Sequence, residues 1–201
     1  MEKILYCDFD GTLIQENSEV MLVNFLIKSG YFKIYHYVLA LICKIINVPR
    51  RLAKRGVIIK AWTAYLSNEK KDELIEWFWK QKISQIHINQ NVLEKIKDFD
   101  GKTIILTGSD QQLVYSFLRK KGIIDLIEKV IGNQVGKSGI RVLCHPYGRD
   151  KCKLLSDSAY KVGIANESAD IFYLSECDEA YIVSGDAELE NAAKKNGWRM
   201  I

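Results

Sequence analysis

Hydrophobic residues change their spacing several times along this chain, and these changes predict where strands and helices lie. Short apolar runs that end in glycine or polar residues predict buried strands. They cover residues 4–7, 102–106, 130–132, 160–165 and 179–183, with a β-like segment at 141–144. Helical spacing separates most of these runs. Because strands alternate with helices, we expect an α/β fold with a doubly wound, mostly parallel, Rossmann-like sheet.

One long helical block without a strand signal interrupts this alternation directly after the first strand. Its apolar residues predict helices over 18–27, 32–48, 51–66 and 69–83, and another over 89–99 leads back to the sheet. We expect Ser18 to be the N-cap of the first of these helices. The pattern therefore predicts an inserted all-helical cap domain at 15–86 and an α/β core domain made of 1–14 and 87–201.

The first predicted strand ends in two carboxylates, Asp8 and Asp10. Residues i and i+2 of an extended chain point to the same side, so both carboxylates can face one site. Gly11 then allows a sharp turn, and Thr12 adds a hydroxyl. Because like charges repel, such a pair favours a cation or a shared proton. The chemistry that fits is nucleophilic attack by one carboxylate beside a divalent metal such as Mg²⁺.

Two other interpretations of this stretch are weaker. Asp-x-Asp-Gly also occurs in ordinary turns that cap a strand. A calcium-binding loop that begins at Asp8 would have Glu19 at its twelfth position, which fits, but Leu13 at its sixth, where a glycine is needed. A strand rather than a helix also precedes the loop. We therefore favour the catalytic interpretation.

The strand followed by Asp8-Phe9-Asp10-Gly11-Thr12 resembles the first signature of the haloacid-dehalogenase-like (HAD) phosphohydrolase superfamily. The resemblance implies that Asp8 is the nucleophile, which becomes an aspartyl-phosphate, and that Asp10 is the general acid/base. Dehalogenase members lack the second Asp, so its presence indicates phosphoryl transfer. The position and helical character of 15–86 resemble the cap of the phosphoserine-phosphatase-like branch. Such a cap would cover the acidic pair and exclude water.

Two further motifs of the family match later parts of the chain. Thr107 and Gly108 follow a predicted strand and precede an amphipathic helix, where a hydroxyl and free backbone N–H groups can bind phosphate. A predicted helix over 147–158 begins near Lys151, which matches the lysine that holds the nucleophile and phosphate in the family. We prefer Lys151 to Lys153, because two leucines expected to be buried follow Lys151 by three and four positions and share its helix face.

The fourth motif departs from the family pattern, which is usually Gly-Asp-x-x-x-Asp with the first Asp on Mg²⁺. This chain has Ala165 and Asn166 in the first two positions and keeps Asp170. A neutral amide oxygen on Asn166 should bind Mg²⁺ more weakly than a carboxylate, and Glu167 is an alternative ligand. The resemblance thus implies a metal site built from Asp8, Asp10 through its backbone carbonyl, Asn166 and Asp170.

The proposed site residues lie at or just past the carboxyl ends of predicted strands. In an open parallel sheet these ends form one crevice, so Asp8, Asp10, Thr107 and Asp170 should converge whatever the family. We therefore predict an Mg²⁺-dependent phosphatase that hydrolyses a small phosphate monoester through an aspartyl-phosphate. A phosphotransferase or mutase of the same family is one alternative. A phosphate-binding or regulatory module that has lost turnover is another, motivated by Asn166.

Composition refines this picture only slightly. The chain has 201 residues, 48% of them hydrophobic, which suffices for one core and a small satellite, and its net charge of +4 does not indicate nucleic-acid binding. Five scattered cysteines without a CxxC pair, and no signal peptide before the first strand, lead us to expect a cytoplasmic protein.

The aromatic-rich run 32–48 is too short and too charged to span a bilayer. With the basic residues at 50–55 it would suit a membrane surface or a lipid groove, but we favour a packed cap helix.

Overall fold

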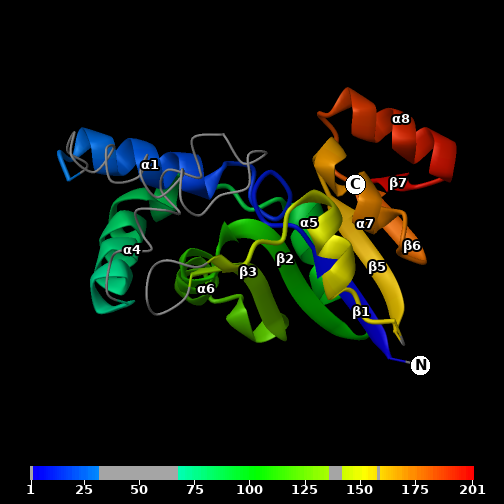
Figure 1. The fold of residues 1–201 in the computed structure, drawn as a ribbon, viewed down its shortest axis with the longest axis horizontal. Helices are drawn as coiled ribbons and strands as arrows, with labels where there is room; N and C mark the ends of the chain where they lie inside the picture. The colour runs from blue at the N-terminus through cyan, green and yellow to red at the C-terminus, as the bar shows by residue number, and fades with distance from the viewer. Residues whose placement is uncertain (1, 32–67, 136–141, 158) are drawn as a thin grey trace.

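The computed structural model describes residues 2–31, 68–135, 142–157 and 159–201. These residues contain a seven-stranded sheet with the strand order β4-β3-β2-β1-β5-β6-β7 (Figure 1). The strands are β1 (Lys3–Cys7), β2 (Lys102–Asp110), β3 (Lys129–Val135), β4 (Val142–Cys144), β5 (Tyr160–Ala165), β6 (Glu179–Ile182) and β7 (Arg199–Met200). All neighbouring strands are parallel except β3 and β4. The predicted doubly wound, mostly parallel sheet is therefore confirmed.

Helices cover both faces of this sheet. They are α1 (Ser18–Lys28), α4 (Asn68–Lys82), α5 (Gln90–Lys97), α6 (Gln111–Lys120), α7 (Ile171–Leu174) and α8 (Ala187–Asn196), with short 3₁₀ turns η1 (Ile83–Gln85), η2 (Ile124–Leu126), η3 (Gly148–Leu154) and η4 (Ser168–Asp170). Side chains of β1 alternate between the faces, as in any strand. Leu5 and Cys7 join the core under α5 and α6, whereas Ile4 and Tyr6 join the core under α7 and α8. Because β1 is buried on both faces, its sequence reads as a continuous apolar run.

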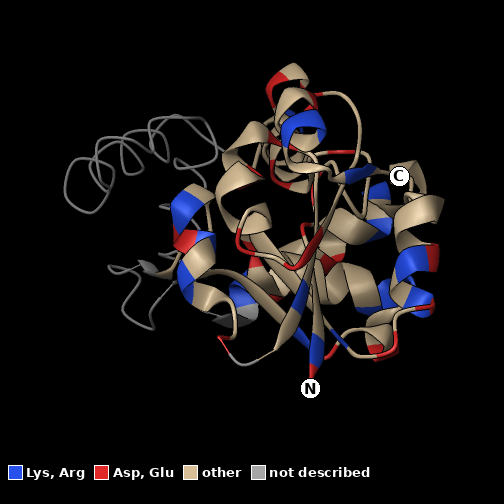
Figure 2. Cartoon of the chain, turned by 90° about the vertical axis from the view of Figure 1, so that its right-hand side faces the viewer, with Lys and Arg blue, Asp and Glu red and all other residues tan. Residues whose placement is uncertain are grey.

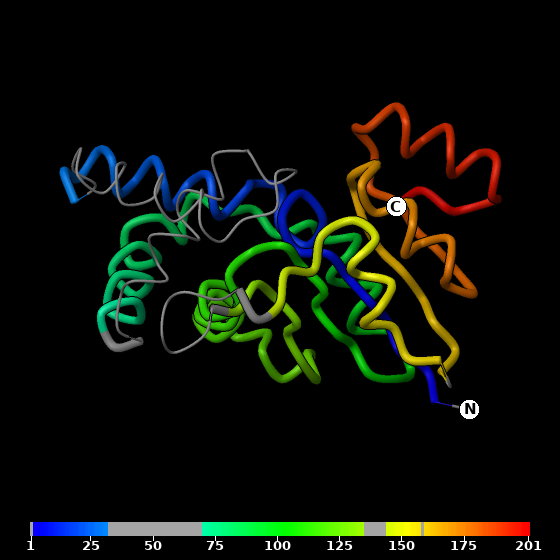
Figure 3. The backbone as a smooth tube through the Cα atoms, viewed as in Figure 1, coloured from blue at the N-terminus to red at the C-terminus, as the bar shows by residue number. Residues whose placement is uncertain are grey.

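Two described helices, α1 and α4, belong to the predicted cap segment and lie together at one side of the molecule (Figure 1). Figure 3 traces the chain from β1 into α1, and from α4 back through α5 into β2. Trp79 anchors α4 to the core: its side chain is fully buried, and its Nε1 donates to the Leu113 carbonyl of α6 at 3.0 Å. The predicted helices over 32–48 and 51–66 lie outside the described residues.

Three local predictions need correction. The N-cap of α1 is Asn17, whose side chain accepts from the Val20 N–H, so Ser18 is the first helical residue. In place of the predicted helix over 147–158, the structure has the 3₁₀ turn η3, which spans only Gly148–Leu154. The terminal strand β7 was not expected, because it has only two residues, both exposed, and therefore carries no hydrophobic pattern.

None of the described helices has the length and hydropathy that a membrane span requires. The aromatic run at 32–48 and the basic residues at 50–55 lie outside the described residues. The described cysteines are free thiols: Cys7, Cys144, Cys152 and Cys177.

Candidate active site

The candidate site lies where β1, β2 and β5 end, beside the loops that follow them. The Asp8 N–H donates to the Ile164 carbonyl at 2.9 Å, so the pairing of β1 with β5 continues as far as Asp8. Phe9 is fully buried and packs edge-on against Phe117 of α6. These contacts fix the backbone from which Asp8 and Asp10 project. Figure 2 shows acidic segments among the loops at this end of the sheet, opposite the N-terminus.

Lys151 joins carboxylates from two distant parts of the chain. Its Nζ lies 3.0 Å from Oδ1 of Asp8 and 2.7 Å from Oδ1 of Asp170, and all three residues are buried. Burial by itself lowers the pKa of Lys151, but the two carboxylates outweigh it and raise that pKa above its usual value. Burial also raises the pKa of Asp170, against the attraction of the lysine. Lys151 therefore carries its charge between these carboxylates.

Lys153, the alternative lysine, points into solvent. It pairs with Asp150 at 2.7 Å, and its side chain is 77% exposed. The structure thus places Lys151 rather than Lys153 against Asp8. The helical spacing used to choose between them does not apply, because η3 is a 3₁₀ turn and the two leucines that follow are only half-buried.

Both carboxylate oxygens of Asp10 accept hydrogen bonds. The N–H of Ser18, the first residue of α1, donates to Oδ1 at 2.7 Å, and the Ser109 hydroxyl donates to Oδ2. Burial raises the pKa of Asp10 to about 6, although these hydrogen bonds oppose the rise. Sequence reasoning missed both serines. A hydroxyl directly after the Thr107-Gly108 motif was the available signal for Ser109, and the start of a predicted helix was the signal for Ser18.

Asn166 packs against the first motif. Its Oδ1 accepts from the Thr12 hydroxyl at 2.9 Å. Gly11 has a left-handed backbone with φ of 72°, and a Cβ at this position would lie 2.1 Å from Nδ2 of Asn166. Glycine is therefore required at position 11 both by the turn and by the approach of Asn166. Glu167, the alternative ligand, is solvent-exposed.

Thr107 and Gly108 lie in an irregular part of β2. The β2–β3 register shifts between Leu106 and Asp110, so the residues between them leave the regular ladder. Thr107 is buried, and its hydroxyl oxygen accepts from the Ser109 N–H at 3.1 Å. A Cβ on Gly108 would come within 3.7 Å of the Tyr147 ring, so the loop that leads into η3 lies beside this turn.

The oxygen atoms near Asp8 suit a hard cation. Lys151 contacts Oδ1 of Asp8, and within the described ranges no hydrogen bond reaches its Oδ2. Asn166 follows β5, the strand paired with β1, and adds a neutral amide oxygen at this end of the sheet. One carboxylate and a neutral oxygen fit Mg²⁺, because that ion usually binds one or two carboxylates and keeps several waters. Among the described residues no three His, Cys, Asp or Glu side chains gather as a metal-binding group.

A second buried ion pair attaches the helices of the cap segment beside this site. Lys71 of α4 contacts Oδ2 of Asp110, and both side chains are only 9% exposed. The backbone N–H of Asp110 also donates to the Glu19 carboxylate of α1 at 3.1 Å. Because Asp110 directly follows Ser109, both helices are attached next to the residue that holds Asp10. Sequence reasoning did not identify this contact.

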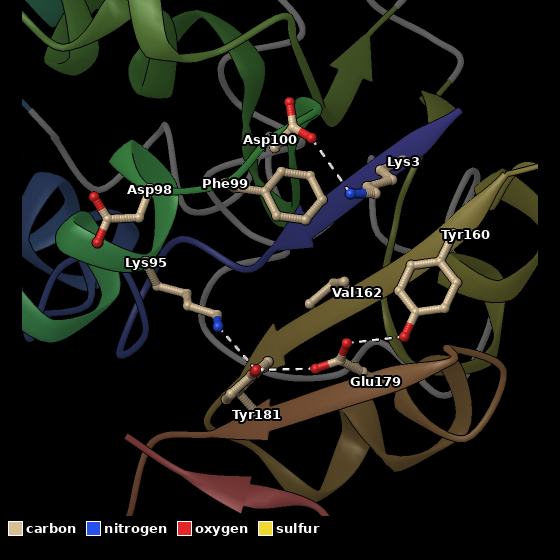
Figure 4. Close-up of a pocket in the computed structure, with 9 residues that line it drawn as sticks. All are labelled: Lys3, Lys95, Asp98, Phe99, Asp100, Tyr160, Val162, Glu179 and Tyr181. Atoms are coloured by element: carbon tan, nitrogen blue, oxygen red, sulfur yellow. Dashed lines mark hydrogen bonds and ion pairs between the residues drawn. The ribbon is translucent and has the colours of Figure 1, made fainter. Parts of the chain in front are cut away.

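A separate pocket of about 520 Å³ lies among the starts of β1, β5 and β6 and the end of α5 (Figure 4). Its polar side chains pair with one another. Lys95 donates to the Tyr181 hydroxyl at 2.8 Å, and Glu179 accepts from Tyr160 and Tyr181 at 2.8 and 3.0 Å. None of the predicted site residues lines this pocket, so we assign it no part in the chemistry.

The fold and the convergent side chains define an α/β protein with an acidic site at the carboxyl ends of its parallel strands. The sequence model of the haloacid dehalogenase-like hydrolase family matches residues 5–175, which run from β1 to the end of α7. The chain therefore belongs to the haloacid dehalogenase-like hydrolases. No curated protein matches the sequence.

Solved structures share this fold at low sequence identity. A protein of unknown function from Bordetella pertussis Tohama I has a TM-score of 0.75 and 14% identity, over 100% of this chain and 97% of that one. Phosphoserine phosphatase in its apo form has a TM-score of 0.57 and 12% identity, over 96% and 91%. A substrate-bound phosphoserine phosphatase has a TM-score of 0.57 and 14% identity, over 100% and 93%. The predicted resemblance to phosphoserine-phosphatase-like proteins is thus confirmed at the level of the fold.

The ion pairs of Lys151 predict a large effect on stability. Lys151→Met leaves Asp8 and Asp170 buried without their cation, and removing one partner of a buried ion pair costs about 3–5 kcal/mol. Lys153→Met, at the exposed lysine, should change the free energy of unfolding by less than about 1 kcal/mol. Urea denaturation of the two variants beside the wild type measures this difference. Equal stability of the two variants would contradict the assigned ion pairs.

Proposed function

We propose that this hydrolase is an Mg²⁺-dependent phosphatase that cleaves a small phosphate monoester through an aspartyl-phosphate on Asp8. One observation carries the proposal. Asp8 is buried, its Oδ1 is paired with the Lys151 ammonium, and its Oδ2 accepts no hydrogen bond from the described residues. The lysine places a positive charge beside one carboxylate oxygen, and the other oxygen remains available to attack phosphorus.

Asp10 is the proposed general acid/base. It protonates the leaving oxygen when Asp8 attacks, and it then removes a proton from the water that hydrolyses the aspartyl-phosphate. A pKa of about 6 supports this role, because a group that titrates near neutral pH can both carry and release a proton. Asp10 is also anchored at both oxygens, so its position does not depend on the substrate.

Lys151, Thr107 and Gly108 are the proposed phosphate ligands. Lys151 supplies a fixed positive charge beside Asp8, and Thr107 supplies a buried hydroxyl from the irregular end of β2. Such preorganised donors stabilise charge that develops on phosphate oxygens. Asp170 pairs with the same ammonium of Lys151 at 2.7 Å, which supports a positioning role rather than a direct one.

Asp8, the Asp10 backbone carbonyl and Asn166 would hold Mg²⁺, with Asp170 next to them. When bound, the ion neutralises charge on Asp8 and on the phosphate oxygens. Asn166 is favoured over Glu167 as the ligand because it packs against Gly11 and Thr12, whereas Glu167 is exposed. An amide in place of a carboxylate removes one negative charge from the site, so binding should be weaker than with aspartate.

We also propose that 15–86 is a cap that covers this site. The support comes from its described helices. The α1 N-terminus donates to Asp10, and Glu19 and Lys71 both contact Asp110 beside the site. A cap attached in this way would exclude water from the aspartyl-phosphate until Asp10 activates the hydrolytic molecule.

One prediction of the proposed function concerns the rate of phosphate release. Phosphate release from a panel of phosphate monoesters should require MgCl₂ and be abolished by EDTA. Asp8→Asn should lower it by roughly three orders of magnitude or more, because the variant lacks the nucleophile. Asp98→Asn, at an exposed aspartate away from the site, is the matched control and should keep wild-type activity. Folded wild-type protein that releases no phosphate from any ester in excess Mg²⁺ would instead favour transfer to another acceptor or simple binding.

The second prediction concerns the metal. Asn166→Asp should tighten Mg²⁺ binding by about tenfold or more, since it restores a charged ligand and still accepts from Thr12. Calorimetric titration of the protein without substrate measures the affinity directly. Glu167→Gln should leave the affinity unchanged. The opposite pattern, with Glu167→Gln weakening Mg²⁺ binding and Asn166→Asp having no effect, would make Glu167 the ligand.

A further inference from the structure

Ser109 contacts two residues of the candidate site through two different atoms. Its hydroxyl donates to Oδ2 of Asp10, and its backbone N–H donates to the Thr107 hydroxyl oxygen at 3.1 Å. Its side chain is buried, with 5% of the residue exposed. One residue thus connects the proposed acid/base to a proposed phosphate ligand.

We propose that Ser109 is a positioning residue of the phosphatase reaction, which holds the carboxyl of Asp10, the proposed acid/base, and orients the Thr107 hydroxyl. The inference rests on the proposed function. Neither role follows from the family motifs matched above, which place Thr107 and Gly108, but not Ser109, in contact with phosphate.

Each oxygen of Asp10 has its own hydrogen-bond donor. Oδ1 faces the Ser18 backbone N–H at 2.7 Å, and the Ser18 hydroxyl also lies beside this carboxyl. Oδ2 faces a hydroxyl, which can donate to a carboxylate and, after rotation about its C–O bond, accept from a carboxylic acid. The Ser109 hydroxyl can therefore hold Oδ2 both as a donor and as an acceptor.

The same residue restricts the hydroxyl of Thr107. Because the Thr107 oxygen accepts from the Ser109 N–H, the Thr107 hydrogen cannot point toward Ser109. It remains available to donate to a phosphate oxygen. This contact comes from the backbone of Ser109, so substitution of the side chain leaves it in place.

Ser109 is itself held rigidly, as a positioning residue must be. A Cβ on Gly132 of β3 would lie only 2.8 Å from the Ser109 carbonyl oxygen, so the two strands approach closely there. The following residue, Asp110, caps α6 and contacts both Lys71 and Glu19. The backbone of Ser109 is thus fixed by the core and by the helices of the cap segment, and only its hydroxyl rotates.

The test compares esters that differ in how much they need an acid. Glycerol 2-phosphate has a poor alkoxide leaving group, whereas p-nitrophenolate leaves with little help from a proton. kcat/KM reports the steps up to departure of the leaving group. Ser109→Ala should lower kcat/KM for glycerol 2-phosphate by about 10- to 100-fold, which is part of the usual contribution of a general acid. The same variant should lower kcat/KM for p-nitrophenyl phosphate by less than about threefold.

Three further variants complete the experiment. Ser109→Thr keeps the hydroxyl and should restore the activity on glycerol 2-phosphate. The thiol of Ser109→Cys fills the space of the hydroxyl but donates weakly, so this variant should show the same difference between the two esters as Ser109→Ala. If Ser109→Ala does not fold, Ser109→Cys takes its place in the experiment. Ser116→Ala is the matched control, because the Ser116 hydroxyl of α6 also donates to a carboxylate, that of Glu76, at 2.6 Å. Ser116→Ala should leave kcat/KM for both esters unchanged.

The outcomes separate the inference from the proposed function. The role of Ser109 is overturned if Ser109→Ala and Ser109→Cys lose kcat/KM equally on both esters. It is also overturned if neither variant loses kcat/KM relative to Ser116→Ala. In both cases hydrolysis by the wild type still supports a phosphatase. Wild-type enzyme that releases no phosphate from these two esters or from any other ester of the panel in Mg²⁺ overturns both. A selective loss on glycerol 2-phosphate that Ser109→Thr restores supports the inference.

Discussion

The structure of the site depends on one charge balance: a buried ammonium between two buried carboxylates. Lys151 draws together the end of β1, the η3 turn and the η4 turn, which are far apart in sequence. Without that cation, Asp8 and Asp170 would repel each other at close range in a largely buried region. The same contact leaves one oxygen of Asp8 without a hydrogen bond from the described residues. The interaction that assembles the site therefore also leaves an oxygen available for reaction.

A second set of contacts makes the cap segment part of the site. Asp10 is held by the first residue of α1 and by Ser109, and the next residue, Asp110, contacts Lys71 of α4. Buried ion pairs contribute little net stability but fix one arrangement against others. Movement of these helices would disturb the residues that hold Asp10, the proposed acid/base. The position of α1 and α4 and the geometry of Asp10 are therefore coupled through two consecutive residues of β2.

The sequence was sufficient for those features that depend on local pattern. The apolar run of β1 predicted a central strand because both of its faces are buried, and Asp8 follows directly from its end. Long-range contacts had no such signal. Lys71 lies among charged residues that read as a solvated helix face, yet it pairs with a residue 39 positions away. The sequence signal for Ser109 as a site residue was weak, because hydroxyl side chains often follow strands. Only the structure shows that this one contacts Asp10.

Detection of the covalent intermediate tests the central role of Asp8 most directly. Wild-type enzyme turning over p-nitrophenyl phosphate in Mg²⁺ would be quenched in acid, digested and analysed by mass spectrometry. A phosphoryl group on the peptide that contains Asp8, removed by hydroxylamine and absent from Asp8→Asn, is the expected result, because an acyl phosphate is labile to that nucleophile. A phosphoryl group on any other residue, or turnover by Asp8→Asn at the wild-type rate, would contradict nucleophilic catalysis by Asp8.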